Sequence, residues 1–206
     1  MLKTLLISGL LYLFFLPYET FCQEKQSGDY IVNIEGDTLF GKVQHLNKKN
    51  VNPKYYKKIR WTNQQGQRRK FNRKDVLAFS VDHQIFEGFW LKPSSQNGLF
   101  GTFTYTIDPK KKERYFLKTL HRGSLNHYEL GWWEQGESLF LTLELFKKKE
   151  DMFLIRVDQG VLGLKRKSLI HYFQECPQLV EKIKNKVLKN SSEIVSFYTT
   201  KCDNPQ

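Results

Sequence analysis

The sequence predicts a mainly β protein: an antiparallel barrel- or sandwich-like sheet domain followed by a short C-terminal α-helical hairpin. Apolar and polar residues alternate in many short runs as far as about Leu164, and turns containing Gly or Asn separate these runs. Near Ser168 the apolar spacing changes from two residues to three or four, which is the change expected where strands give way to helices. A hydrophobic content of 40% and an aromatic content of 15% favour a packed domain over a disordered chain.

Residues 1–22 are typical of a cleaved signal peptide, followed by a β-rich domain over 23–166 and helices over 167–206 that pack on the same domain. The apolar run of the leader has about a dozen residues, fewer than the roughly 20 needed to cross a membrane. Cys22 admits two interpretations, an acylated lipoprotein cysteine or the last residue before a cut. Because Glu19 and Phe21 do not suit acylation, we predict cleavage before Gln23 and an exported mature chain.

Short runs of alternating polarity predict the strands of the sheet. They lie at residues 30–34, 39–43, 59–61, 77–81, 103–107, 114–130, 139–146 and 152–157. The run over 114–130 is expected to be a hairpin that turns at Arg122-Gly123. With that centre, His121 faces Ser124 and His127 faces Lys118 across the two strands. Many short strands with Gly-containing turns, such as Gly36-Asp37 and Asn97-Gly98, are typical of antiparallel sheets.

The C-terminal residues predict helices because their apolar side chains recur at helical spacing. One or two helical turns are expected at 169–173, and Pro177 suits the first position of the next helix. Asn190-Ser191-Ser192 is expected to end that helix and to cap another.

Four segments spread over most of the chain form a set: DYIVNIEGDTLFGKV, RRKFNRKDVLAF, YFLKTLHRGSLNHYEL and YFQECPQLVEKI. This set resembles the small exported proteins of unknown function that are common in Bacteroidetes-type bacteria. The resemblance implies a periplasmic, outer-envelope or extracellular location in a Gram-negative bacterium. Each segment is structural in character, so the resemblance assigns no catalytic residue.

The net charge of +12 comes from one segment of the chain. Residues 38–74 contain twelve of the 33 Lys and Arg residues and no Asp or Glu, so the other 21 bases balance the 21 acids. Such a concentrated positive charge attracts polyanions through counterion release, and the expected partners are lipopolysaccharide, acidic glycans or extracellular DNA. The alternative is a solvated basic hairpin that only aids solubility. The candidate binding residues are Lys54, Lys57, Lys58, Arg60, Arg68, Arg69, Lys70, Arg73 and Lys74.

Catalytic and metal-binding motifs do not stand out in the sequence. The five histidines accompany no HExxH, CxxC or GxSxG pattern, and we predict neither a metal site nor a cofactor. Asp82-His83 could form half of a catalytic dyad, but no nucleophile lies in a recognisable setting. We therefore expect a non-enzymatic binding or scaffold module. The alternative is an envelope hydrolase acting on glycan or lipid, with carboxylates or histidines assembled from separate strands.

Cys176 and Cys202 remain after signal cleavage. Cys176 precedes Pro177 at the start of one predicted helix, and Cys202 follows the end of the next. Two antiparallel helices joined by a short loop bring these ends together, so we predict a disulfide of the kind that persists in oxidising compartments. The alternative is two separate thiols, with Cys176 activated at a helix N-terminus.

Overall fold

The computed structural model of the protein describes residues 28–44, 58–95, 103–110, 114–133, 140–159 and 162–203. The predicted signal peptide and its cut before Gln23 lie outside these ranges, as do the Asn97-Gly98 turn and the candidate residues Lys54 and Lys57. Among the described residues, no helix is long and apolar enough to cross a membrane.

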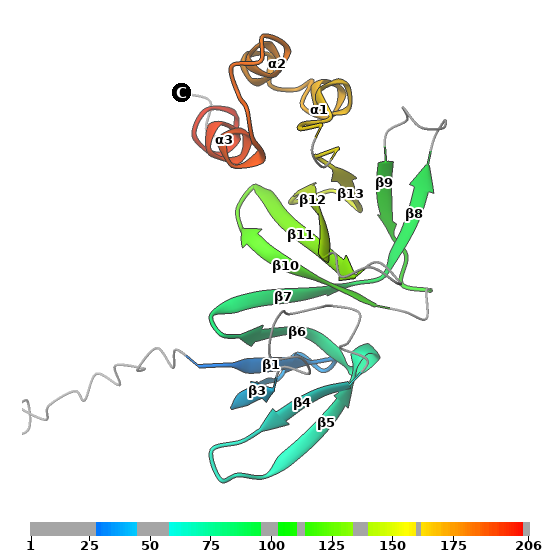
Figure 1. Ribbon diagram of the computed structural model, residues 1–206, viewed down its shortest axis with the longest axis vertical. Coiled ribbons are helices and arrows are strands. Elements are labelled where there is room, and N and C mark those ends of the chain that lie inside the picture. Colours follow the sequence, from blue (N-terminus) through cyan, green and yellow to red (C-terminus); the bar gives the residue numbers. More distant parts are fainter. Residues whose placement is uncertain are drawn as a thin grey trace, which may run out of the picture.

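Ten strands form one antiparallel sheet in the order β2-β1-β6-β7-β10-β11-β12-β13-β9-β8 (Figure 1). The order begins with β2 and ends with β8, so the sheet is not closed into a barrel. The predicted mainly β class with an antiparallel sheet is confirmed. The strands are β1 (Tyr30–Asn33), β2 (Thr38–Phe40), β6 (Val76–Val81), β7 (Gln84–Phe89), β8 (Leu91–Ser95), β9 (Phe103–Ile107), β10 (Tyr115–His121), β11 (Leu125–Trp133), β12 (Phe140–Lys148) and β13 (Phe153–Arg156).

A second, three-stranded antiparallel sheet consists of β3 (Lys42–Gln44), β4 (Lys58–Thr62) and β5 (Arg68–Asn72). A short 3₁₀ helix, η3 (Arg73–Asp75), connects it back to the large sheet. Apolar side chains of the small sheet share one buried cluster with β1, β6, β7 and β10. The two sheets therefore pack on each other in a sandwich-like arrangement at this end of the molecule (Figure 1).

Gly41 separates the two sheets, whereas the sequence predicted one continuous strand over 39–43, which was wrong. The chain leaves β2 at Gly41 and enters β3 of the small sheet. A Cβ atom at this position would lie 2.4 Å from the carbonyl oxygen of Thr62 and 2.6 Å from Nε1 of Trp61. Glycine thus permits the close approach of β4 to the point where the chain changes sheet.

The β10–β11 hairpin has a different register from the predicted one. His121 lies opposite His127, so the predicted pairing of His121 with Ser124 was wrong. The register shifts between Thr119 and His121, which is the effect of a β-bulge, and the connection is longer than two residues. Arg122-Gly123 is therefore part of the loop but not its centre.

Three α-helices and one π-helical turn follow the strands, as the change of apolar period predicts. They are α1 (Arg166–Tyr172), α2 (Pro177–Lys184), α3 (Ser191–Phe197) and η5 (Tyr198–Cys202). Pro177 occupies the first turn of α2, and the Oδ1 atom of Asn190 accepts a hydrogen bond of 2.9 Å from the backbone N–H of Glu193 at the start of α3. Buried side chains of the helices share one core with Leu125, Phe146 and Ile155 of the sheet. Figure 1 shows the helices at the end of the large sheet opposite to the small sheet.

The predicted disulfide between Cys176 and Cys202 is confirmed. Their Cα atoms lie 5.8 Å apart, within the range for a bridged pair, and 26 positions separate the two residues. The bond joins the residue before α2 to the last residue of η5. Since both sulfur atoms are bonded, the alternative of two separate thiols is contradicted.

Candidate functional site

The small sheet presents most of its basic residues on one face. Side chains alternate between the two faces of a strand, and on β4 the side chains of Ile59 and Trp61 are buried against the large sheet. Lys58 and Arg60 therefore project away from the large sheet. On β5, Lys70 lies directly opposite Arg60.

The same alternation adds two more residues to this face. Arg68 of β5 and Lys42 of β3 both lie opposite Thr62, the residue that follows Trp61 on β4. All of these basic side chains are exposed. We call this surface the basic face, made of Lys42, Lys58, Arg60, Arg68 and Lys70.

The basic face concentrates positive charge on one side of the small sheet. In the described part of the chain, no ion pair involves any of its five residues. Arg60 and Lys70 are cross-strand neighbours of like charge, an arrangement that destabilises a sheet. Proteins keep such destabilising arrangements mainly at functional sites. Neighbouring like charges are therefore expected where a surface binds a ligand of opposite charge.

Three of the other predicted binding residues lie off the basic face, and Lys54 and Lys57 are outside the described residues. Arg69 points to the opposite face of β5 from Arg68 and Lys70, and its guanidinium carbon lies 5.3 Å from the ring centroid of Phe71. Arg73 and Lys74 belong to η3, beyond the end of the strand. The structure therefore brings together four of the nine predicted residues on one face, and Lys42 is a member that the prediction missed.

A hollow of about 370 Å³ lies at the small sheet, lined by residues of all three strands, among them Gln44, Arg60, Arg68, Arg69 and Lys70. This volume is within the range of small-molecule sites, about 300–1,000 Å³. A guanidinium group binds phosphate or carboxylate through two parallel hydrogen bonds, and an ammonium group adds a point charge. The hollow can therefore hold one anionic group of a larger ligand.

The Asp82-His83 pair forms a turn of the large sheet. Both residues have positive φ values, 47° and 61°, and they form the two-residue turn between β6 and β7. The backbone N–H of Asp82 donates a hydrogen bond of 3.0 Å to Oδ1 of Asp29. Within the described ranges, no group of three or more His, Cys, Asp or Glu residues could hold a metal ion.

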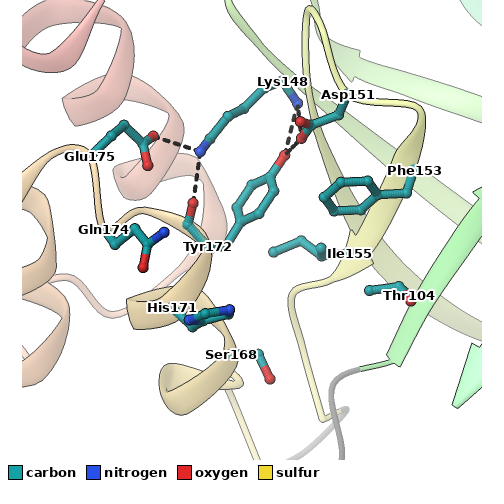
Figure 2. A pocket seen from close by; sticks show the side chains of 10 residues that line it. All are labelled: Thr104, Lys148, Asp151, Phe153, Ile155, Ser168, His171, Tyr172, Gln174 and Glu175. Carbon is teal, nitrogen blue, oxygen red and sulfur yellow. Dashed lines mark hydrogen bonds and ion pairs between the residues drawn. The ribbon is translucent and has the colours of Figure 1, made fainter. Parts of the chain in front are cut away.

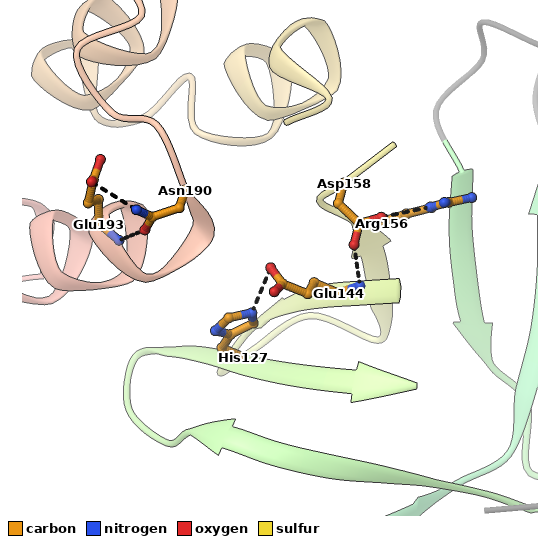
Figure 3. Close-up of polar contacts among 6 residues, drawn as sticks. All are labelled: His127, Glu144, Arg156, Asp158, Asn190 and Glu193. Atoms are coloured by element: carbon orange, nitrogen blue, oxygen red, sulfur yellow. Dashed lines mark hydrogen bonds and ion pairs between the residues drawn. The ribbon is translucent and has the colours of Figure 1, made fainter. Parts of the chain in front are cut away.

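A polar network that the sequence did not predict lies between the sheet and the helices (Figure 3). The Nε2 atom of the buried His127 lies 3.3 Å from Oε2 of Glu144. The backbone N–H of Glu144 donates to Oδ2 of Asp158 at 2.9 Å, and Arg156 pairs with Oδ1 of the same carboxylate. The hydrogen bond from His127 lowers the pKa of Glu144 below its usual value. The network connects β11, β12 and the residues that follow β13.

Comparison with protein-family models, with curated protein sequences and with solved structures finds no match to this chain. The fold and the site define its class: an antiparallel β protein with a disulfide-linked helical C-terminus and a basic face on a second sheet.

Proposed function

We propose that the protein is a non-enzymatic binding module whose basic face holds an anionic polymer. The observation that carries this proposal is the pairing of Arg60 with Lys70 on the exposed face of β4 and β5, in a segment that has no acidic residue. Repeated phosphates or carboxylates are the chemistry that such a face recognises. Lipopolysaccharide, acidic glycans and extracellular DNA all offer it.

We also propose that the protein acts outside the cytoplasm, as a periplasmic, outer-envelope or extracellular protein. The apolar leader over residues 1–22 and the Cys176–Cys202 bond support this location, because structural disulfides persist in oxidising compartments. The polymers named above are found in the same surroundings.

Binding to three immobilised polyanions tests the proposal: lipopolysaccharide, heparin and duplex DNA. The test variant replaces Arg60, Arg68 and Lys70 with Gln. Its matched control replaces the exposed Lys167, Lys184 and Lys189 of the helical region with Gln, so that both variants lose three positive charges. We expect the test variant to lose most of its binding and the control to keep it.

The comparison among the three polymers identifies the source of the anionic groups. If the wild type binds one polymer and the test variant does not, that polymer represents the partner class. Failure to bind any of them, or equal losses in the two variants, would contradict the proposal and leave the basic face as a solubility device.

A further inference from the structure

A second hollow, of about 400 Å³, lies between helix α1 and the strands β9, β12 and β13. The elements that bound it lie at the end of the large sheet opposite to the small sheet (Figure 1). Figure 2 shows Ser168 and His171 of α1 on one side of this hollow and Phe153 and Ile155 of β13 on another. The space is thus bounded by polar groups from the helical region, by apolar groups of β13 and by the polar Thr104 and Lys148 of the sheet.

One rim of the hollow is held in a fixed arrangement by Tyr172. Its hydroxyl donates a hydrogen bond to Oδ2 of Asp151 and accepts one of 2.8 Å from the backbone N–H of Lys148. Burial, together with the hydrogen bond to Asp151, raises the pKa of the Tyr172 hydroxyl, which therefore stays protonated. The ammonium group of Lys148 lies 2.6 Å from Oε1 of Glu175 and 4.3 Å from the Tyr172 ring centroid. Lys148 and Glu175 thus form an ion pair at this rim, and the Asp151 carboxylate accepts the hydrogen bond from Tyr172.

The polar groups left for a ligand are a hydroxyl, an imidazole and an amide from the helical region. Ser168 and His171 lie one helical turn apart on α1, and Gln174 follows the end of the helix. In the part of the chain that the structure describes, none of these three side chains has a hydrogen-bond partner. A hydroxyl, an imidazole and a primary amide together offer both donors and acceptors to one small molecule.

We propose that this hollow binds a neutral saccharide ring. The ring's hydroxyl groups, each of which donates and accepts, would pair with Ser168, His171 and Gln174, and its C–H face would lie against Phe153 and Ile155. An anionic ligand fits less well, because Lys148 is paired with Glu175 and the Asp151 carboxylate leaves a negative charge at the rim. The size of the hollow suits a small molecule, and the prearranged rim lowers the entropy cost of binding.

Ligand-observed saturation-transfer NMR on the folded protein tests the proposal. The panel contains the methyl glycosides of glucose, galactose, mannose and N-acetylglucosamine, with methyl glucuronide as a charged comparison. We expect transfer to at least one neutral glycoside at a Kd of about 1 mM or below, and weaker transfer to the glucuronide. The double variant His171→Ala/Gln174→Ala should weaken that binding by roughly tenfold.

Two further variants show whether saccharide binding belongs to this hollow alone. Lys167→Ala changes an exposed residue of the same helix that does not line the hollow, and it should leave saccharide binding intact. The Arg60, Arg68 and Lys70 variant should also bind the saccharide as the wild type does, so failure of either proposal is recognised independently of the other. Circular dichroism confirms that each variant is folded. No transfer to any neutral glycoside at about 10 mM, unchanged binding by the double variant, or preference for the glucuronide would overturn the proposal.

Discussion

The imidazole Nε2 of His127 lies 3.3 Å from Oε2 of Glu144, and the same carboxylate is hydrogen-bonded to Ser191 in the first turn of α3. One acidic side chain thus links two strands of the sheet to a helix that is distant in sequence. The side chain of His127 is 4% exposed and that of Glu144 is 32% exposed, so the contact is partly shielded from water. Glu144 is accordingly expected to help hold the helices on the sheet.

Replacing Glu144 with Gln should lower stability at neutral pH by about 1 kcal/mol, because a charge-assisted hydrogen bond becomes a neutral one. Since the folded-state pKa of Glu144 is depressed, its contribution is complete above the unfolded pKa, near 4.5, and is lost as the pH falls through the lower folded value. Thermal unfolding from pH 7 to pH 3 should therefore show a gap between wild type and Glu144→Gln that closes in acid. The exposed Glu181 of α2, changed to Gln, is the matched control. A gap that persists unchanged at pH 3 would contradict this role.

Reduction of the Cys176–Cys202 bond should destabilise the protein by roughly 3.5 kcal/mol, since it releases a loop whose ends are 26 positions apart. Urea unfolding of the oxidised and reduced forms measures this difference. The oxidised protein without its leader has no free cysteine. After unfolding it should therefore show no thiol that reacts with Ellman's reagent. A free thiol, or equal urea midpoints for the two forms, would argue against a stabilising bond.

Gly88 of β7 should not tolerate a side chain. A Cβ atom there would lie 2.4 Å from Cδ of the buried Arg114 and 2.9 Å from the carbonyl oxygen of Leu77. We expect Gly88→Ala to cost about 1–3 kcal/mol by overpacking. Gly28→Ala is the control, because nothing lies within 4 Å of the added atom. Similar urea midpoints for the two variants would show that Arg114 moves aside at little cost.

We predict that the mature protein begins at Gln23. Removal of residues 1–22 follows from the length of the apolar run and from the unsuitability of Glu19 and Phe21 for acylation. Mass spectrometry of the protein recovered from the cell envelope or medium measures the N-terminus. A diacylglyceryl group on Cys22 would instead show a lipoprotein.

Local patterns in the sequence predict most of the fold. Alternating polarity predicts β6, β9 and β12. The change of apolar period, together with Pro177 and Asn190, predicts the helices. The strand β7 was missed because its turn, Asp82-His83, adopts positive φ values without the usual glycine. The strand β5 was missed because charged residues occupy both of its faces, which removes the alternation that would reveal it.

The functional surfaces are predictable only in part, because tertiary pairing decides them. The charge of residues 38–74 is visible in the sequence, but the separation of Arg69 from Arg68 and Lys70 depends on which face of β5 meets the large sheet. The hollow beside α1 combines residues from β9, β12, β13 and the helical region, which no local pattern connects. Its recognition needed the structure.

The dependence of polyanion binding on salt tests the central claim most directly. With duplex DNA as the probe, a plot of log K against log salt concentration has a slope of about −0.9 for each phosphate contacted. Changing Arg60, Arg68 and Lys70 to Gln should make this slope shallower by about 2.7, whereas changing Lys167, Lys184 and Lys189 should leave it unchanged. The same slope in both variants, or a larger change in the helical variant, would show that the basic face is not the binding surface.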